Sequence, residues 1–147
     1  MDLLIYSDKS ELGKFFDRKI DIPNCPRFTK AYIVDLFIRY IDAESDLSNH
    51  SLTLLYKEAI DSCSFDKLQN IGDWLMFTKS LYPDSLTGAS IEYYETLARS
   101  AYYKCYVMLR RQWVVYEELA DQFPYFTEAI NQSFHTTDQR ASLLGCS

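Results

Sequence analysis

The stretch KLQNIGDWLMFTKSL, residues 67–81, is the most informative part of this chain about its architecture. Plotted as a helix, it carries apolar side chains on almost every side, and only Gln69, Asn70 and Asp73 form a narrow polar strip. A helix that is apolar nearly all round is buried among other helices. The stretch therefore predicts a central helix, and Pro83 directly after it marks the end because proline cannot continue a helix.

Amphipathic patterns upstream predict three further helices. A short helix over residues 9–18 precedes the connector 21–26, whose two prolines forbid helix. Residues 28–41 then repeat apolar side chains at the i, i+3, i+4 and i+7 spacing of one helix face. A third helix begins after Ser51 as N-cap, places Leu54, Leu55 and Ala59 inward, and ends near Cys63.

Downstream, the sequence predicts a long helix and two shorter ones. Ser90 is the expected N-cap of the long helix, whose inward stripe reads Ile91, Tyr94, Leu97, Ala98, Ala101, Cys105, Met108 and Leu109. A helix over residues 114–123 meets Pro124, which suits the first turn of a last helix over residues 125–134.

Composition supports one helical domain. The chain has 147 residues, of which 48% are apolar, and only four glycines and four prolines, too few for the turns of an all-β domain. We therefore expect an all-α fold, a compact bundle of six or seven helices, with a single domain over residues 1–135. Residues 136–147 show no sustained apolar period and predict a flexible C-terminal tail.

Charge and cysteine usage limit the setting and the partners. The net charge of −6 opposes nucleic-acid binding, because affinity for nucleic acid comes mainly from the phosphate backbone. Four cysteines occur singly, without a zinc-site spacing, as expected in a reducing compartment. The N-terminal residues lack the basic region of a signal peptide, and no apolar run is long enough to span a membrane. We expect a soluble cytoplasmic protein without membrane contact.

The sequence contains no pattern that predicts catalysis. His50 and His135 belong to neither of the helical metal-site patterns Glu-x-x-His and His-Glu-x-x-His, and the glycine-rich loops that hold phosphates are missing. We therefore expect no metal, no cofactor and no catalytic residue, although an enzyme using isolated carboxylates or a lone cysteine would leave no such pattern.

Two dipeptides, Gly72-Asp73 and Ala98-Arg99, place a charged residue directly after a small one and predict a contact between their helices. A glycine within a helix costs about 1 kcal/mol relative to alanine, so Gly72 indicates a close helix crossing. If the long helix crosses there, Asp73 meets Arg99, and Trp74 lies beside the pair. Such a pair would be a small-molecule binding site inside the bundle, or alternatively a buried lock between helices, or the two charges would be unrelated.

A second candidate surface is one face of the long helix. Helical spacing aligns Glu92, Glu95, Arg99, Tyr103, Tyr106 and Arg110 on this Tyr/Arg face. Tyrosine and arginine are enriched at interface hot spots, so the face suits a protein partner or a second copy of the chain. The alternative is that another helix covers it. Arg110 and Arg111 with Trp113 would also suit nucleic-acid stacking, but two cations at a helix end more often complement the helix dipole.

Two segment pairs carry a resemblance to known proteins. They are Ile71-Gly72-Asp73-Trp74-Leu75-Met76-Phe77 with Leu81-Tyr82-Pro83-Asp84, and Tyr93-Tyr94 with Arg99-Ser100-Ala101-Tyr102. These resemble segments of uncharacterised bacterial all-helical proteins that pair a Gly-Asp helix, ending in an aromatic-Pro step, with a Tyr-rich helix. The resemblance implies a bacterial intracellular setting and no activity.

Together, these observations favour a non-enzymatic interaction module. The predicted contact residues are Arg99, Tyr103, Tyr106 and Arg110, with a protein partner or a homodimer on the Tyr/Arg face. The alternative is a small-molecule-binding protein or enzyme with its site around Asp73, Trp74 and Arg99.

Overall fold

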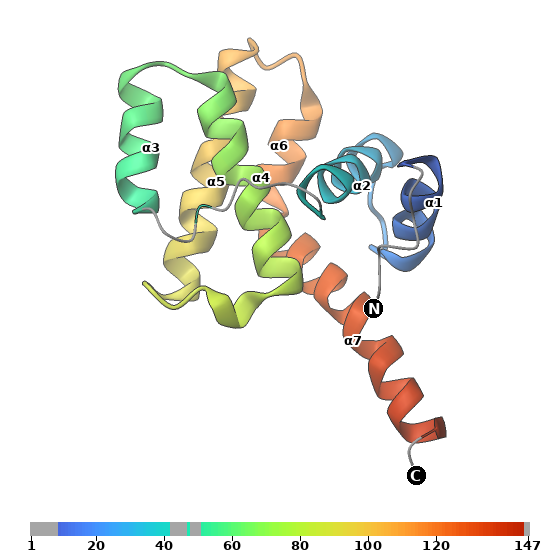
Figure 1. Cartoon of the computed structure of the whole chain (residues 1–147). Helices are drawn as coiled ribbons and strands as arrows, with labels where there is room; N and C mark the ends of the chain where they lie inside the picture. The colour runs from blue at the N-terminus through green and yellow to red at the C-terminus, as the bar shows by residue number, and fades with distance from the viewer. Residues whose placement is uncertain (1–8, 42–46, 48–50, 146–147) are drawn as a thin grey trace.

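The computed structural model describes residues 9–41, 47 and 51–145 of the chain (Figure 1). Seven α-helices and one 3₁₀ turn follow one another in these ranges, without any strand. They are α1 (Lys9–Lys19), α2 (Arg27–Ile41), α3 (Leu52–Asp61), α4 (Phe65–Leu81), the 3₁₀ turn η2 (Pro83–Ser85), α5 (Ile91–Met108), α6 (Val114–Asp121) and α7 (Phe123–Gly145). The predicted all-α bundle in a single domain is confirmed.

The helix α4 is the centre of the bundle, as its sequence predicts. It packs against α2, α3, α5 and α7, and in Figure 1 it lies in the middle of the molecule. Every residue from Ile71 through Thr78 is buried, including Asp73. Of the polar strip of α4, Asp73 is therefore enclosed by other helices, while Gln69 and Asn70 are half-buried.

Side-chain caps fix the starts of three helices. The hydroxyl of Ser51 accepts a hydrogen bond from the backbone N–H of Leu54, and Ser90 does the same for Tyr93. Both predicted N-caps are confirmed, and Ser64 caps α4 in the same way. Each cap satisfies a backbone donor that the first helical turn leaves unpaired.

Several predicted inward positions are wrong. Leu54 is 67% exposed, because Leu52 and Ala59 share the buried face of α3 and Leu54 lies on the other side of that helix. On α5, Ile91 and Met108 are exposed because they are its first and last residues, beyond the cover of the neighbouring helices, whereas the middle of the stripe is buried. The end of α3 agrees with the prediction, since Cys63 follows it in an exposed left-handed turn with a φ of 49°.

The last helix is longer than predicted. α7 contains Pro124 in its first turn, but it continues beyond Phe134 to Gly145 (Figure 1). Residues 135–144 contain no proline or glycine, so backbone hydrogen bonds can extend the helix without an apolar face. The expected helix end at Phe134 is therefore wrong, and flexibility of residues 136–147 stays a prediction.

The connector between α1 and α2 is held against α7. The hydroxyl of Tyr125 donates to the carbonyl oxygen of Pro23 at 2.8 Å, and Ser133 Oγ accepts from the backbone N–H of Asp21 at 3.0 Å. These bonds join segments about a hundred residues apart and fix α1 and α2 to the bundle.

Within the described ranges, no helix combines the length and apolarity that crossing a lipid bilayer requires.

Candidate functional site

The predicted pair of Asp73 and Arg99 does not form. Asp73 is 1% exposed, and its Oδ1 accepts hydrogen bonds from the hydroxyls of Tyr32 and Tyr102, each at 2.8 Å. Its Oδ2 pairs with Arg39 Nη2 at 3.3 Å. The cation that meets Asp73 therefore comes from α2, and Arg99 instead donates a hydrogen bond to the backbone of α6.

Gly72 has the packing role that the sequence predicts, with a different partner. A Cβ at position 72 would lie 2.8 Å from Cε1 and 2.9 Å from Cζ of the Tyr102 ring. Only glycine allows this ring to lie on α4, and the same approach brings its hydroxyl to Asp73. The close crossing of α4 and α5 is thus made by an aromatic ring over glycine.

The polar contacts around Asp73 continue into a closed network. Gln69 Nε2 donates to the hydroxyls of Tyr32 and Tyr116, at 3.2 and 2.8 Å. Beside Gln69 on α4, Asn70 accepts a hydrogen bond from the hydroxyl of Tyr40. Buried polar groups that satisfy one another in this way fix the relative positions of α2, α4, α5 and α6.

Burial dominates the ionisation of this network. Desolvation raises the pKa of Asp73 above its ordinary value, while the hydrogen bonds from Tyr102 and Tyr32 and the charge of Arg39 oppose the rise. Burial also raises the pKa of Tyr102 and of Tyr32, and the nearby Asp73 charge adds to both. Asp73 lines none of the three cavities described below, so we interpret the network as a structural lock.

Trp74 lines a different part of the molecule from Asp73 and Arg99, its predicted partners. It lines a cavity of about 500 Å³ together with residues of the η2–α5 connection and with Tyr93 and Tyr94. The cavity has hydroxyl-bearing side chains and no charged residue in its lining. A single site built from Asp73, Trp74 and Arg99 is therefore not present, because successive positions on α4 face different neighbours.

The Tyr/Arg face of α5 is partly covered. Glu95 pairs with Lys79 of α4 at 3.2 Å, and Tyr106 is half-buried beside Glu117 of α6. Arg110 lies beyond the end of α5 with a φ of 57°, so it does not continue the face. Arg99 and Tyr103 remain exposed, and only these two predicted residues come together in one cavity.

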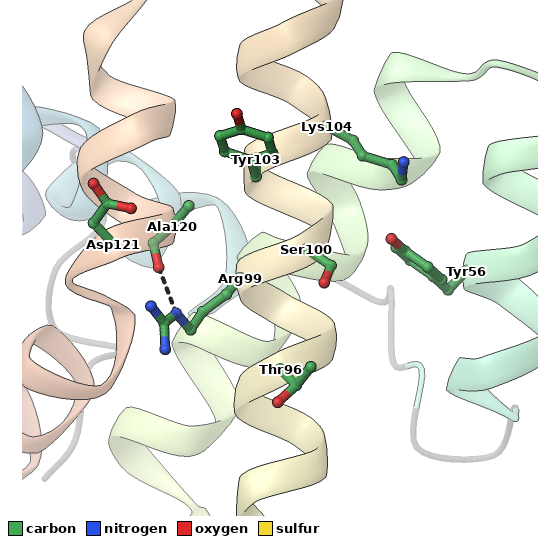
Figure 2. A pocket seen from close by; sticks show the side chains of 8 residues that line it. All are labelled: Tyr56, Thr96, Arg99, Ser100, Tyr103, Lys104, Ala120 and Asp121. Atoms are coloured by element: carbon green, nitrogen blue, oxygen red, sulfur yellow. Dashed lines mark hydrogen bonds between the residues drawn. The ribbon is translucent and has the colours of Figure 1, made fainter.

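That cavity is a groove along α5 with a volume of about 510 Å³ (Figure 2), which we name the α5 groove. Its floor is formed by Thr96, Arg99, Ser100, Tyr103 and Lys104 of α5, one wall by Tyr56 of α3 and the other by Ala120 and Asp121 of α6. Figure 2 shows α5 in the middle, with α6 and α3 on its two sides.

Arg99 is held at the α6 wall by its Nε. This atom donates a hydrogen bond of 2.9 Å to the carbonyl oxygen of Ala120, in the last turn of α6 (Figure 2). A cation there is also favoured by the helix dipole. The two terminal nitrogens of the guanidinium form no hydrogen bond or ion pair with a described residue, although Asp121 lies on the same wall.

The arrangement therefore offers donors to an anion. Lys104 also has no acidic partner among the described residues, and the hydroxyl of Tyr103 makes no hydrogen bond with any of them. Arginine and lysine with nearby hydroxyls are the groups that bind carboxylate or phosphate. Lys104 and Tyr56 were not among the predicted site residues. Lys104 lies one turn beyond Ser100 on the same helix, so helical spacing alone indicates that these two side chains are neighbours.

The structure also shows an apolar surface that the sequence reading missed. Phe28, Trp113 and Val114 are 53%, 60% and 50% exposed and border a cavity of about 610 Å³. The sequence does indicate this surface, because Phe28 is a large apolar residue that lies outside the buried stripe of Ile33 and Phe37 on α2.

In the part of the chain that the structure describes, no three His, Cys, Asp or Glu side chains converge in a way that would hold a metal ion. His50 lies outside the described residues.

Comparisons with protein-family models, curated proteins and solved structures find no match for this chain. The resemblance to bacterial helical proteins therefore stays a prediction.

Proposed function

We propose that this protein is a non-enzymatic binding module of the cytoplasm, and that its α5 groove takes an acidic segment of a partner protein. One observation carries the proposal: Arg99 and Lys104 lie in one groove without an acidic partner among the described residues, in a chain whose net charge is −6. Other cations do form ion pairs with acids, as Lys67 does with Glu58 and Lys79 with Glu95.

The groove also has the composition of an interface. Tyr103 is 45% exposed and Tyr56 lies opposite on α3, so aromatic side chains flank the two cations. Interfaces are enriched in tyrosine and arginine, and the fixed Nε of Arg99 directs the rest of the guanidinium to the incoming group. A carboxylate there would accept two parallel hydrogen bonds from Arg99.

Fluorescence anisotropy with a labelled peptide tests this proposal. The probe is a flexible peptide rich in Glu and Tyr, and its control replaces each Glu with Gln. We expect the acidic peptide to bind more tightly, and Arg99→Ala or Lys104→Ala to weaken it about tenfold, since a hydrogen bond to a charged group contributes about 1.5–3 kcal/mol. Lys14→Ala, which removes an exposed cation of α1, should leave binding unchanged.

Two results would contradict the proposal. Equal binding of the Glu and Gln peptides would exclude recognition of an anion by the groove. A solution mass that rises with concentration in light scattering, and that Arg99→Ala returns to the monomer value, would instead assign the groove to a homodimer.

A further inference from the structure

The apolar surface of the molecule has the features of a second binding site. Phe28, Ala31 and Tyr32 of α2 lie on one side of it, and Trp113, Val114, Val115 and Tyr116 on the other. We call this cavity the apolar groove. Its lining includes no charged residue, and its only other member is Gln112. Soluble proteins seldom leave three large apolar side chains exposed together unless the patch contacts something.

The floor of the apolar groove is rigid and its polar atoms are already bonded. The rings of Tyr32 and Tyr116 pack edge to face, with centroids 5.5 Å apart. The hydroxyl of Tyr32 donates to Asp73, and that of Tyr116 accepts from Gln69, so both point into the buried network. The groove therefore presents aromatic faces, and it offers an occupant apolar contact more than hydrogen bonds.

The turn between α5 and α6 holds Trp113 in place. Arg110 and Arg111 both adopt left-handed backbone conformations, with φ of 57° and 58°, which non-glycine residues rarely adopt. The N–H of Arg111 donates to the carbonyl of Tyr106 at 2.9 Å, and that of Gln112 to Leu109 at 3.2 Å. A surface fixed in this way loses little conformational freedom on binding.

The charges beside the groove indicate what kind of partner fits. Arg110 and Arg111 directly precede Gln112 in the chain, both are exposed, and neither forms an ion pair with a described acid. Of the acids on α6, Glu117 lies beside Tyr106, and Glu118 is near enough to Cys25 to help raise the pKa of that thiol. The α5–α6 edge of the groove is therefore cationic.

We propose that the apolar groove binds an amphipathic helix of a partner protein, with apolar side chains over Tyr32 and Tyr116 and acidic side chains beside Arg110 and Arg111. Helices that dock in this way place residues i, i+3, i+4 and i+7 in a groove between two elements. The groove lies between α2 and α6, and the two arginines select the acidic flank. With the α5 groove, the module would then contact two different segments.

Intrinsic fluorescence tests this proposal directly. The chain has two tryptophans, and Trp74 is 7% exposed, so a change in environment at the apolar groove is reported by Trp113. The probe is a synthetic helical peptide with leucines on one face and glutamates along one border. We expect its addition to shift the emission to shorter wavelength, and a peptide with lysines at the border to bind at least tenfold more weakly.

Matched variants locate the binding. Phe28→Ser and Val114→Ser should each weaken binding of the Glu-bordered peptide about tenfold, and Leu54→Ser, at a still more exposed apolar position on α3, should have no effect. Arg110→Gly with Arg111→Gly removes both charges while keeping the left-handed turn free of strain, and should abolish the preference for glutamate over lysine. Arg99→Ala should change nothing, which separates this site from the α5 groove. Circular dichroism confirms that each variant is folded.

Other occupants give other results. Failure of the Glu-bordered peptide to shift the emission overturns the proposal. A shift with vesicles of anionic lipid or with single-stranded oligothymidine, but not with the peptide, assigns the groove to a membrane surface or to nucleic acid and also overturns it. A mass that doubles with concentration in the native chain but not in Phe28→Ser shows a second copy as the occupant, with the same consequence.

Discussion

The ring of Tyr102 lies on the backbone of Gly72, and its hydroxyl donates a hydrogen bond of 2.8 Å to Asp73. One side chain of α5 thus explains two neighbouring residues of α4. The glycine provides the space, and the carboxylate accepts the bond. The close crossing of α4 and α5 at the centre of the bundle depends on this contact.

Replacing Gly72 with alanine should destabilise the protein. The added methyl group would lie within 3.0 Å of three atoms of the buried Tyr102 ring, which has no free space to move. Overpacking of this kind costs about 1–3 kcal/mol, more than the gain of up to about 1 kcal/mol from the better helix propensity of alanine. Urea-induced unfolding followed by circular dichroism measures the difference.

Gly13→Ala is the matched control for that change. Gly13 is also in a helix, but a Cβ there would meet only Ile38 Cδ1, at an ordinary distance of 3.4 Å. We expect this variant to be more stable than the native chain by about 0.5–1 kcal/mol. Equal or greater stability of Gly72→Ala would show that the Tyr102 ring is not held in place.

Removing Arg39 should affect stability more than removing Arg99. Arg39→Ala leaves the buried Asp73 without its cation, and we expect a loss of about 1–2 kcal/mol, less than for a fully buried pair because 43% of the Arg39 side chain is exposed. Arg99→Ala should stay within about 0.5 kcal/mol of the native chain, since its side chain lies at the surface. The reverse order in urea unfolding would restore Arg99 as the partner of Asp73.

Alkaline pH should unfold the protein by ionising buried tyrosines. An unfolded tyrosine has a pKa of about 10, and burial raises the pKa of Tyr102 and Tyr32 above that value. Above about pH 10 the folded state therefore binds more protons than the unfolded state, and stability falls as the pH rises further. Below that pH this contribution to stability is fully present.

Tyrosinate absorbance should accordingly appear in separate steps. The late step should coincide with loss of the circular dichroism signal, and Tyr102→Phe should reduce its amplitude. In concentrated urea all twelve tyrosines should titrate together. A single step in the folded protein near the pKa of free tyrosine would mean that the hydroxyls in the network are accessible to water.

The cysteines should differ strongly in reactivity. Cys63 is exposed in the turn after α3, whereas Cys105 is fully buried in α5 and burial raises its pKa to about 12. The thiolate is the reactive form, so iodoacetamide at neutral pH should alkylate Cys63 rapidly and Cys105 only after unfolding. Mass mapping of the peptides distinguishes these sites. Rapid labelling of Cys105 would show that α5 opens from α4 in the native state.

The sequence predicted local features well where one residue type has one local role. Ser51 and Ser90 are caps because a hydroxyl before a helix bonds a free N–H two or three residues on, and Pro83 ends α4 because it cannot continue the ladder. The central position of α4 also followed from its composition, since a helix without a polar face needs cover on all sides.

The same reasoning could not assign partners. Gly72 correctly indicated a close crossing, but the spacing along one helix does not say which residue of another helix arrives there. The sequence therefore offered Arg99 for Asp73, and the structure brings Arg39 and Tyr102 instead. Likewise, Trp74 follows Asp73 in the chain but faces a different cavity, because adjacent residues on a helix point about 100° apart.

Local sequence patterns are enough to specify the helices, their caps and the burial of α4, because these depend on the backbone and on neighbours within a few residues. Which charges are paired and which surfaces are left open depends on how the helices pack together. Arg39 and Arg99 are both arginines on amphipathic helices, and only packing places one against a buried carboxylate and the other in an open groove. The physical reason is that an ion pair or a groove depends on distances between helices, which tertiary packing sets and local sequence patterns do not record.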